Sequence, residues 1–80
     1  MDDDEIIGRI DRLVDEERVL REQHVLEPLT DADADRLRVV EEALDQCWDL
    51  LRQRRARRNA GLDPDTAKSR DVGIVKHYQQ

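Results

Sequence analysis

Five arginines crowd into the stretch "RQRRARR", and their guanidinium groups could bind phosphates or carboxylates. Arginine-rich helices bind RNA through salt-sensitive phosphate contacts, so a nucleic acid or another polyanion is one candidate partner. No aromatic stacking platform and no helix-turn-helix spacing accompany the cluster, which makes nucleic acid the less favoured partner. We expect the cluster to be neutralised within the protein or by a second copy. Its members are Arg52, Arg54, Arg55, Arg57 and Arg58.

Three other side chains that could carry chemistry have structural explanations. His24 has no second histidine or cysteine at helical spacing, so we expect a hydrogen bond to Asp33 or to a loop carbonyl and no metal. Cys47 falls at an apolar position, where a thiol is a small buried side chain and not a reactive one. Glu17 interrupts the apolar pattern, and we expect it to pair with Arg21, four residues later, or with an arginine on the other helix.

Catalytic constellations are missing from the sequence. It shows no nucleophile–base pairing, no glycine-rich phosphate loop and no metal motif. We therefore expect no catalytic residues, no cofactor and no metal site, and a protein that is not an enzyme.

Length and composition narrow the class further. Eighty residues make one domain, and a single cysteine cannot form an intrachain disulfide. Charged residues are 42% of the chain, but the apolar residues recur periodically, which favours long solvated helices over disorder. A net charge of -6 disfavours a broad nucleic-acid surface. The start "MDDDE" lacks a signal-peptide pattern and no apolar run could span a membrane, so we expect a cytoplasmic protein without membrane contact.

Two segments carry apolar residues at alternating spacings of three and four, which is typical of helices packed along a seam. We expect helices over residues 3–26 and 31–60. Pro28 disfavours helical backbone at the preceding residue, Thr30 is a good N-cap, and Gly61 stands where helices end. The two predicted seams comprise Ile6, Ile10, Leu13, Leu20 and His24 in the first helix, and Leu37, Val40, Leu44, Cys47 and Leu51 in the second.

A loop of about four residues makes the two helices antiparallel. If the numbers of facing residues add to about 57, Ile6 faces Leu51 and nearly every apolar seam residue finds an apolar partner. The same register places the acidic residues 2–5 opposite the arginines that begin at Arg52. We therefore predict ion pairs at this end of the hairpin, which orient the helices more than they stabilise them because salt screens exposed pairs.

One seam cannot bury all the apolar residues. Homodimerisation into a four-helix bundle would cover the surplus, and so would a C-terminal arm over residues 62–80. The expected fold class is therefore all-α: an antiparallel hairpin over residues 1–61 with an arm or tail, dimerising into a bundle. The predicted dimer or arm contacts are Ile7, Val14, Trp48, Leu50 and Tyr78.

Three blocks of the sequence resemble one protein family. They are "DDDEIIGRIDRLVDEERVLRE", "LDQCWDLLRQRRA" and the closing "GIVKHYQQ", and together they cover nearly the full chain. The chain is similar to a family of short actinobacterial proteins that is defined only as a domain of unknown function, DUF2630. The resemblance implies a small cytoplasmic helical protein and assigns no activity, so it transfers no functional residue.

Two function hypotheses follow. The first is a non-enzymatic protein–protein interaction module, acting as a homodimer or as an adaptor for another protein. The alternative is a nucleic-acid or polyanion binder that uses the arginines of residues 52–58. Binding to RNA and DNA across a salt series separates the two, because phosphate-driven binding strengthens at low salt.

Overall fold

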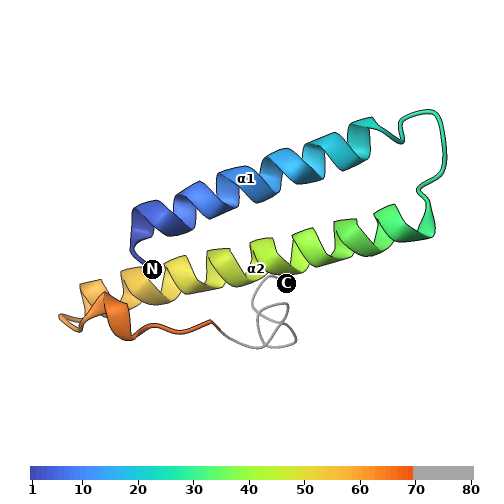
Figure 1. Ribbon diagram of the computed structural model, residues 1–80. Helices are drawn as coiled ribbons and strands as arrows, with labels where there is room; N and C mark the ends of the chain where they lie inside the picture. The colour runs from blue at the N-terminus through green and yellow to red at the C-terminus, as the bar shows by residue number, and fades with distance from the viewer. Residues whose placement is uncertain (70–80) are drawn as a thin grey trace.

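The computed structural model describes residues 1–69 and consists of two long helices lying side by side (Figure 1). Helix α1 spans Asp3–Glu22, helix α2 spans Asp31–Asn59, and the short 3-10 helix η1 spans Pro64–Thr66. The two long helices are antiparallel, and every regular element in the described range is helical. The predicted all-α helical hairpin is therefore confirmed. No helix of the described range is long and apolar enough to cross a bilayer.

The helix ends are set by local hydrogen bonds. Asp2 and Glu5 form a capping box at the start of α1, in which each side chain accepts a hydrogen bond from the other residue's backbone N–H. Thr30 caps α2 by accepting a hydrogen bond from the Asp33 N–H at 3.1 Å. At the other end of α2, Gly61 has a φ of 74° and Leu62 donates to the Arg57 carbonyl, the pattern of a Schellman motif.

Helix α1 ends at Glu22, four residues before the predicted boundary. Leu20 is its last buried residue, and beyond Leu37 α2 offers only the small apolar side chains of Ala32 and Ala34 to a further turn. A longer helix would gain little apolar burial, and the chain leaves the helix after Gln23. The second predicted helix agrees with α2 to within one residue at its end.

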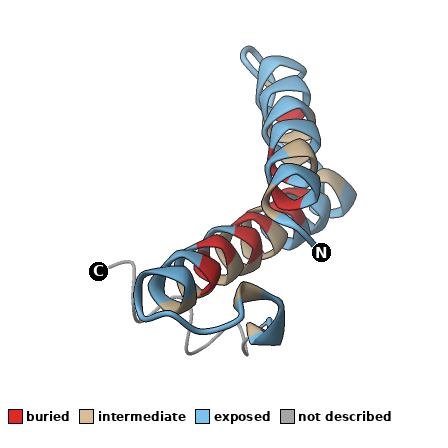
Figure 2. Cartoon of the chain, turned by 90° about the vertical axis from the view of Figure 1, so that its left-hand side faces the viewer, coloured by how far each residue is buried: buried red, intermediate tan, exposed pale blue. Residues whose placement is uncertain are grey.

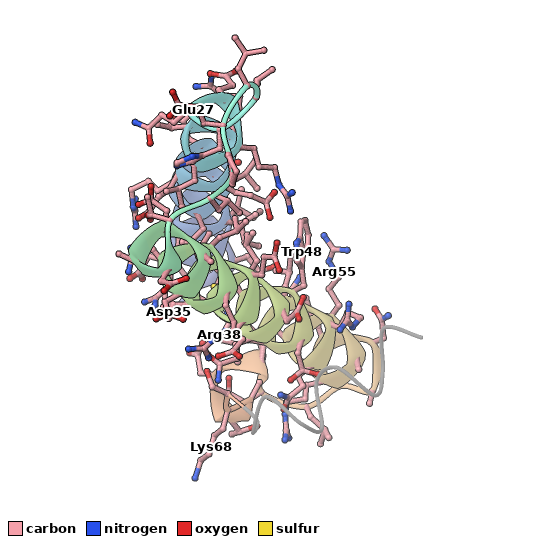
Figure 3. All side chains as sticks on the ribbon, turned by 90° about the vertical axis from the view of Figure 1, so that its right-hand side faces the viewer. Glu27, Asp35, Arg38, Trp48, Arg55 and Lys68 are labelled. Carbon is pink, nitrogen blue, oxygen red and sulfur yellow. The ribbon has the colours of Figure 1, made fainter. Side chains whose placement is uncertain are left out.

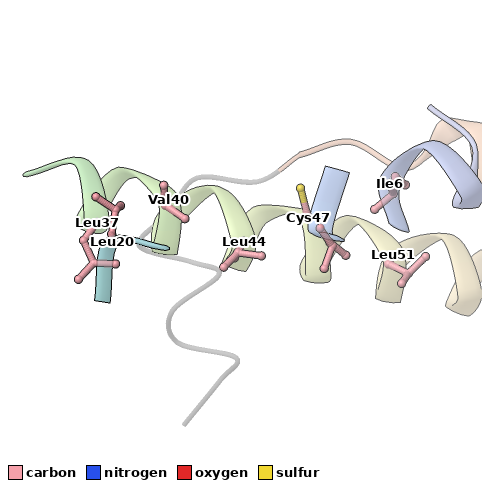
Figure 4. Close-up of a cluster of buried hydrophobic side chains, with 8 residues drawn as sticks. Ile6, Leu20, Leu37, Val40, Leu44, Cys47 and Leu51 are labelled. Atoms are coloured by element: carbon pink, nitrogen blue, oxygen red, sulfur yellow. The ribbon is translucent and has the colours of Figure 1, made fainter. Parts of the chain in front are cut away.

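The core is a row of apolar side chains between α1 and α2 (Figure 4). Buried positions form a stripe along the contacting faces, while the outer faces and the loop are exposed (Figure 2). Contacts of Asp3 with Arg54 and of His24 with Asp33, at opposite ends of the hairpin, confirm the predicted register. The buried apolar residues are Ile6, Ile10, Leu20, Leu37, Val40, Leu44, Cys47 and Leu51.

The segment 62–69 folds back along α2 (Figure 1), and Ser69 at its end shares a small pocket with residues of both long helices. Gln53 of α2 donates a hydrogen bond to the Lys68 carbonyl at 2.6 Å, and Arg54 donates one to Asp65 at 2.9 Å. This part of the predicted arm therefore lies against its own hairpin. Tyr78, the predicted contact residue of the arm, lies outside the described residues.

Candidate functional site

The arginine cluster divides by position on α2. Arg54 and Arg58, one helical turn apart, both reach Asp3 at the start of α1, each at 2.6 Å. The predicted ion pairs between the acidic N-terminus and the cluster are thus confirmed for Asp3. Asp2 and Glu5 instead hold the capping box of α1. The two guanidinium groups thus share one carboxylate at this end of the hairpin.

Arg54 is the buried member of the cluster, with 6% of its surface exposed. Its Nε donates to Asp3 and its Nη1 to Asp65, so the guanidinium joins α1, α2 and the segment after α2. A buried charge is costly unless it is paired, and two carboxylates meet that requirement. The hydrogen bonds from Arg54 and then from Arg58 lower the pKa of Asp3 from its ordinary value of 3.8.

The other three arginines have no ion pair among residues 1–69. Arg52 and Arg55 are exposed, and Arg57 is half-buried. Arg57 lies seven residues after Leu50 and therefore on the same stripe of α2, whereas Arg55 lies seven residues after Trp48 on a different stripe. The cluster therefore does not form one continuous cationic surface.

Three single-residue predictions are confirmed. Nε2 of His24 hydrogen-bonds Oδ2 of Asp33 at 2.6 Å, although its Nδ1 is buried without a partner in the described structure. Arg21 lies 3.9 Å from the carboxylate of Glu17, four residues earlier. Cys47 is buried, and burial raises the pKa of its thiol even though the neighbouring Arg9 acts in the opposite direction. None of these side chains combines the exposure and pairing that a reactive group needs.

Two stripes of residues at intervals of seven form one face of the hairpin, which we call the Trp48 face. On α1 the stripe is Ile7, Val14 and Arg21, and on α2 it is Glu41, Trp48 and Arg55. The Arg21–Glu41 ion pair, at 2.8 Å, joins the ends of the two stripes and shows that they lie on the same side. The centre of this face is apolar, and its ends are charged.

The apolar side chains of the Trp48 face remain solvent-accessible. Ile7, Val14 and Trp48 are 42%, 45% and 43% exposed. Trp48 and Arg55 project from one side of α2, and Lys68 lies on the other (Figure 3). The described part of the arm therefore leaves the Trp48 face open.

Leu50, the fourth predicted contact residue, lies on the other side of the hairpin. It is half-buried and lines a small pocket of about 100 Å³ with Ser69 of the arm segment and Arg9 of α1. The ion pair between Arg36 and Glu16, at 2.6 Å, closes the same side nearer the loop. Leu50 is therefore placed beside the arm, apart from the other three residues.

Comparison with known proteins identifies the family. The family model described as "Protein of unknown function (DUF2630)" matches residues 2–80. The chain belongs to the DUF2630 family. The chain is similar to the "Uncharacterized protein Rv0898c" of Mycobacterium tuberculosis and to the "Uncharacterized protein Mb0922c" of Mycobacterium bovis. Each is 44% identical over 77 residues, which cover 95% of this chain and 88% of the relative. No solved structure gives a significant match.

For this DUF2630 chain, sequence reasoning missed the residues that fix the segment after α2. Asp65 as a second partner of Arg54 was not anticipated, nor was the hydrogen bond from Gln53 to Lys68. The sequence signal for this arrangement is "GLDPD", residues 61–65. A helix-ending glycine followed by a capped Pro turn reverses the direction of the chain, so the carboxylates after the glycine return to the last turns of α2. Within residues 1–69, His, Cys, Asp and Glu side chains form no group suited to a metal ion.

Proposed function

We propose that this protein is a non-enzymatic protein–protein interaction module of the cytoplasm that acts as a homodimer through the Trp48 face. The observation that carries the proposal is the exposed apolar centre of that face, built from Ile7, Val14 and Trp48 on both helices. Tryptophan is the residue type most enriched at the energetic centres of protein interfaces, and arginine accompanies it there. Trp48 with the exposed Arg52 and Arg55 provides this combination.

The shape of the face favours a second copy as the occupant. The Trp48 face runs across both helices on one side of the hairpin, so stacking two such faces produces a four-helix bundle. A twofold interface uses the same patch on both subunits and requires no second partner surface. The face contains both signs of charge, Arg21 and Glu41 at one end and Arg55 at the other, which suits self-association.

Sedimentation of the native chain at micromolar concentration tests the homodimer. We expect a species of twice the 9.4 kDa chain mass, and we expect Trp48→Glu to shift it to the monomer while the helical circular dichroism persists. Leu26→Glu is the matched control, because Leu26 is 95% exposed at the loop and lies off the Trp48 face. A native chain that stays monomeric would overturn the homodimer and favour an adaptor role for another protein.

A polyanion binder is the second candidate, and the three arginines without an ion pair in the described structure favour it. Arg52, Arg55 and Arg57 could each contact a phosphate. Fluorescence anisotropy with labelled RNA and DNA at ~50 mM salt tests this function, because phosphate-driven binding is strongest there. Absence of binding at that salt concentration counts against it. Binding that weakens with added salt and with Arg55→Glu supports it.

A further inference from the structure

Beside its buried seam, helix α2 carries a second stripe of residues that is centred on Trp48. The charged residues of this stripe are acidic before Trp48 and basic after it. The stripe is Glu41, Asp45, Trp48, Arg52 and Arg55, at spacings of four, three, four and three. This is the spacing that places residues on one face of a helix that packs along another helix. Two acidic residues precede the tryptophan and two basic residues follow it.

The charges of this stripe are largely unsatisfied within the described structure. Among residues 1–69, Asp45, Arg52 and Arg55 have no ion pair. Glu41 accepts a hydrogen bond from Arg21 and remains 46% exposed on its side chain, so it can take a second partner. The two halves of the stripe therefore carry available charges of opposite sign, acidic before Trp48 and basic after it.

We propose that α2 of one chain pairs antiparallel with α2 of a second copy, with the twofold axis at Trp48. This inference rests on the proposed function and specifies its geometry. An antiparallel pair centred on Trp48 places Arg55 opposite the partner's Glu41 and Arg52 opposite the partner's Asp45. The twofold symmetry repeats both contacts, so one stripe supplies four ion pairs around two packed indole rings.

Helix α1 fits the same symmetry axis. Ile7 and Val14 lie on either side of Ile10, which packs in the core with Cys47, the neighbour of Trp48. A twofold axis at Trp48 therefore also passes near Ile10, and it brings Ile7 close to the partner's Val14. Both helices of the hairpin then meet their own copies, and the apolar centre of the Trp48 face is covered by itself.

The competing arrangement stacks α1 of one copy on α2 of the other. In the register of about 57 it would place Asp45 near the level of the partner's Asp11, a like-charge contact, and Arg52 near the level of the partner's acidic residues 2–5. Only the α2–α2 arrangement gives both the acidic and the basic half of the stripe a partner of opposite charge. Asp11 itself does not distinguish the two arrangements, because it lies near another carboxylate in both. The choice between them therefore depends on Asp45 and on the arginines that face it.

A charge-exchange experiment tests the pairing. Arg52→Glu with Arg55→Glu makes the stripe wholly acidic, and Glu41→Arg with Asp45→Arg makes it wholly basic. We expect each variant alone to dimerise with a dissociation constant at least about tenfold above the native one, because like charges then face each other. An equimolar mixture should form the heterodimer in native mass spectrometry and sedimentation. Circular dichroism of each variant checks that the helices are retained.

The matched control is Arg57→Glu, which changes net charge as Arg55→Glu does, two residues away on the same helix and off the stripe. It should dimerise like the native chain. Native dimers that lose affinity with Trp48→Glu, while the mixture yields no heterodimer, would overturn the α2–α2 pairing and leave the proposed homodimer intact. A monomeric native chain would overturn both.

Discussion

Arg54 is the residue on which the open end of the hairpin depends. Its guanidinium is almost fully buried, and it donates to Asp3 on one side and to Asp65 on the other. The planar fork of arginine can hold two carboxylates at once, which the single ammonium of lysine does less well. Arg58 adds a second contact to Asp3 from the next turn of α2. The start of α1 is therefore fixed by specific geometry and not by a diffuse attraction of charges.

In the Asp3→Asn variant, the stability of the hairpin should depend less on pH in the acidic range than it does in the native chain. The pKa of Asp3 is lowered in the folded protein by Arg54 and Arg58, so its ionised form stabilises the fold above the ordinary pKa of 3.8. That contribution disappears as the pH falls through the lower, folded-state pKa. We expect the native chain to melt at a higher temperature than Asp3→Asn near neutral pH, with the gap closing in strong acid.

Melting curves between pH 7 and pH 2 measure this gap. Asp31→Asn is the control, because Asp31 occupies the first turn of α2, where it shares the helix-dipole effect without an arginine contact. A gap between Asp3→Asn and the native chain that stays constant into strong acid would show that Asp3 acts through something other than its charge.

At this scale the sequence predicted the opposing charges but not their partners. The pattern Asp2-x-x-Glu5 is itself a capping box, which competes with the arginines for the same carboxylates. Asp2 and Glu5 form the local hydrogen bonds of the capping box, and Asp3 forms the ion pairs with α2. The "GLDPD" turn indicates that the chain reverses after α2, but the sequence does not show which of Asp63 and Asp65 reaches Arg54.

At the scale of elements, the helix ends show how much local chemistry determines. Thr30 and Gly61 were identified from sequence as cap residues, and both act as such. The end of α1 was predicted from Pro28, which disfavours helical backbone only at the residue before it, whereas α1 stops earlier because the side chains of Val25 and Leu26 find no core there. Tertiary packing, which a single sequence does not display, decides where that helix stops.

Two glycine substitutions should change stability in opposite directions. Gly61→Ala should destabilise the protein by about 1–2 kcal/mol, because a Cβ is disfavoured at the left-handed φ of 74°. Gly8→Ala should stabilise it by up to about 1 kcal/mol, because Gly8 is within α1 and an added Cβ meets nothing closer than Arg12 at 3.7 Å. Urea unfolding of both variants measures the difference. Equal changes in the free energy of unfolding for the two variants would contradict the left-handed conformation of Gly61 and the helical conformation of Gly8.

At the scale of the whole molecule, the two sides of the hairpin are not equivalent. The segment 62–69 occupies the side of Leu50, and the Trp48 face stays open. The sequence predicted dimer or arm contacts for Leu50, Ile7, Val14 and Trp48 without saying which residue makes which kind of contact. The separation depends on which side the arm takes, and the polar contacts of Asp65 and Lys68 decide that.

The neighbouring residues Ile6 and Ile7 should separate folding from association. Ile6 is fully buried, so Ile6→Ala should cost about 2–5 kcal/mol of folding stability. Ile7→Ala should leave the stability of the dilute chain within about 0.5 kcal/mol of the native value and weaken the dimer. Denaturation at several protein concentrations measures both quantities. Loss of folding stability with Ile7→Ala at high dilution would place that side chain in the core of the monomer.

The fork of Arg54 also joins two parts of the chain that are far apart in sequence. Because one guanidinium holds both Asp3 and Asp65, order at the beginning of α1 and order in the segment after α2 are thermodynamically linked. An affinity tag joined ahead of Met1 that draws Asp3 away would weaken the attachment of residues 62–69, although Asp3 and Asp65 are far apart in sequence, and limited proteolysis of that segment would detect the change. Tag placement is therefore a variable in any handling of this protein, and a tag cleaved before assay avoids it.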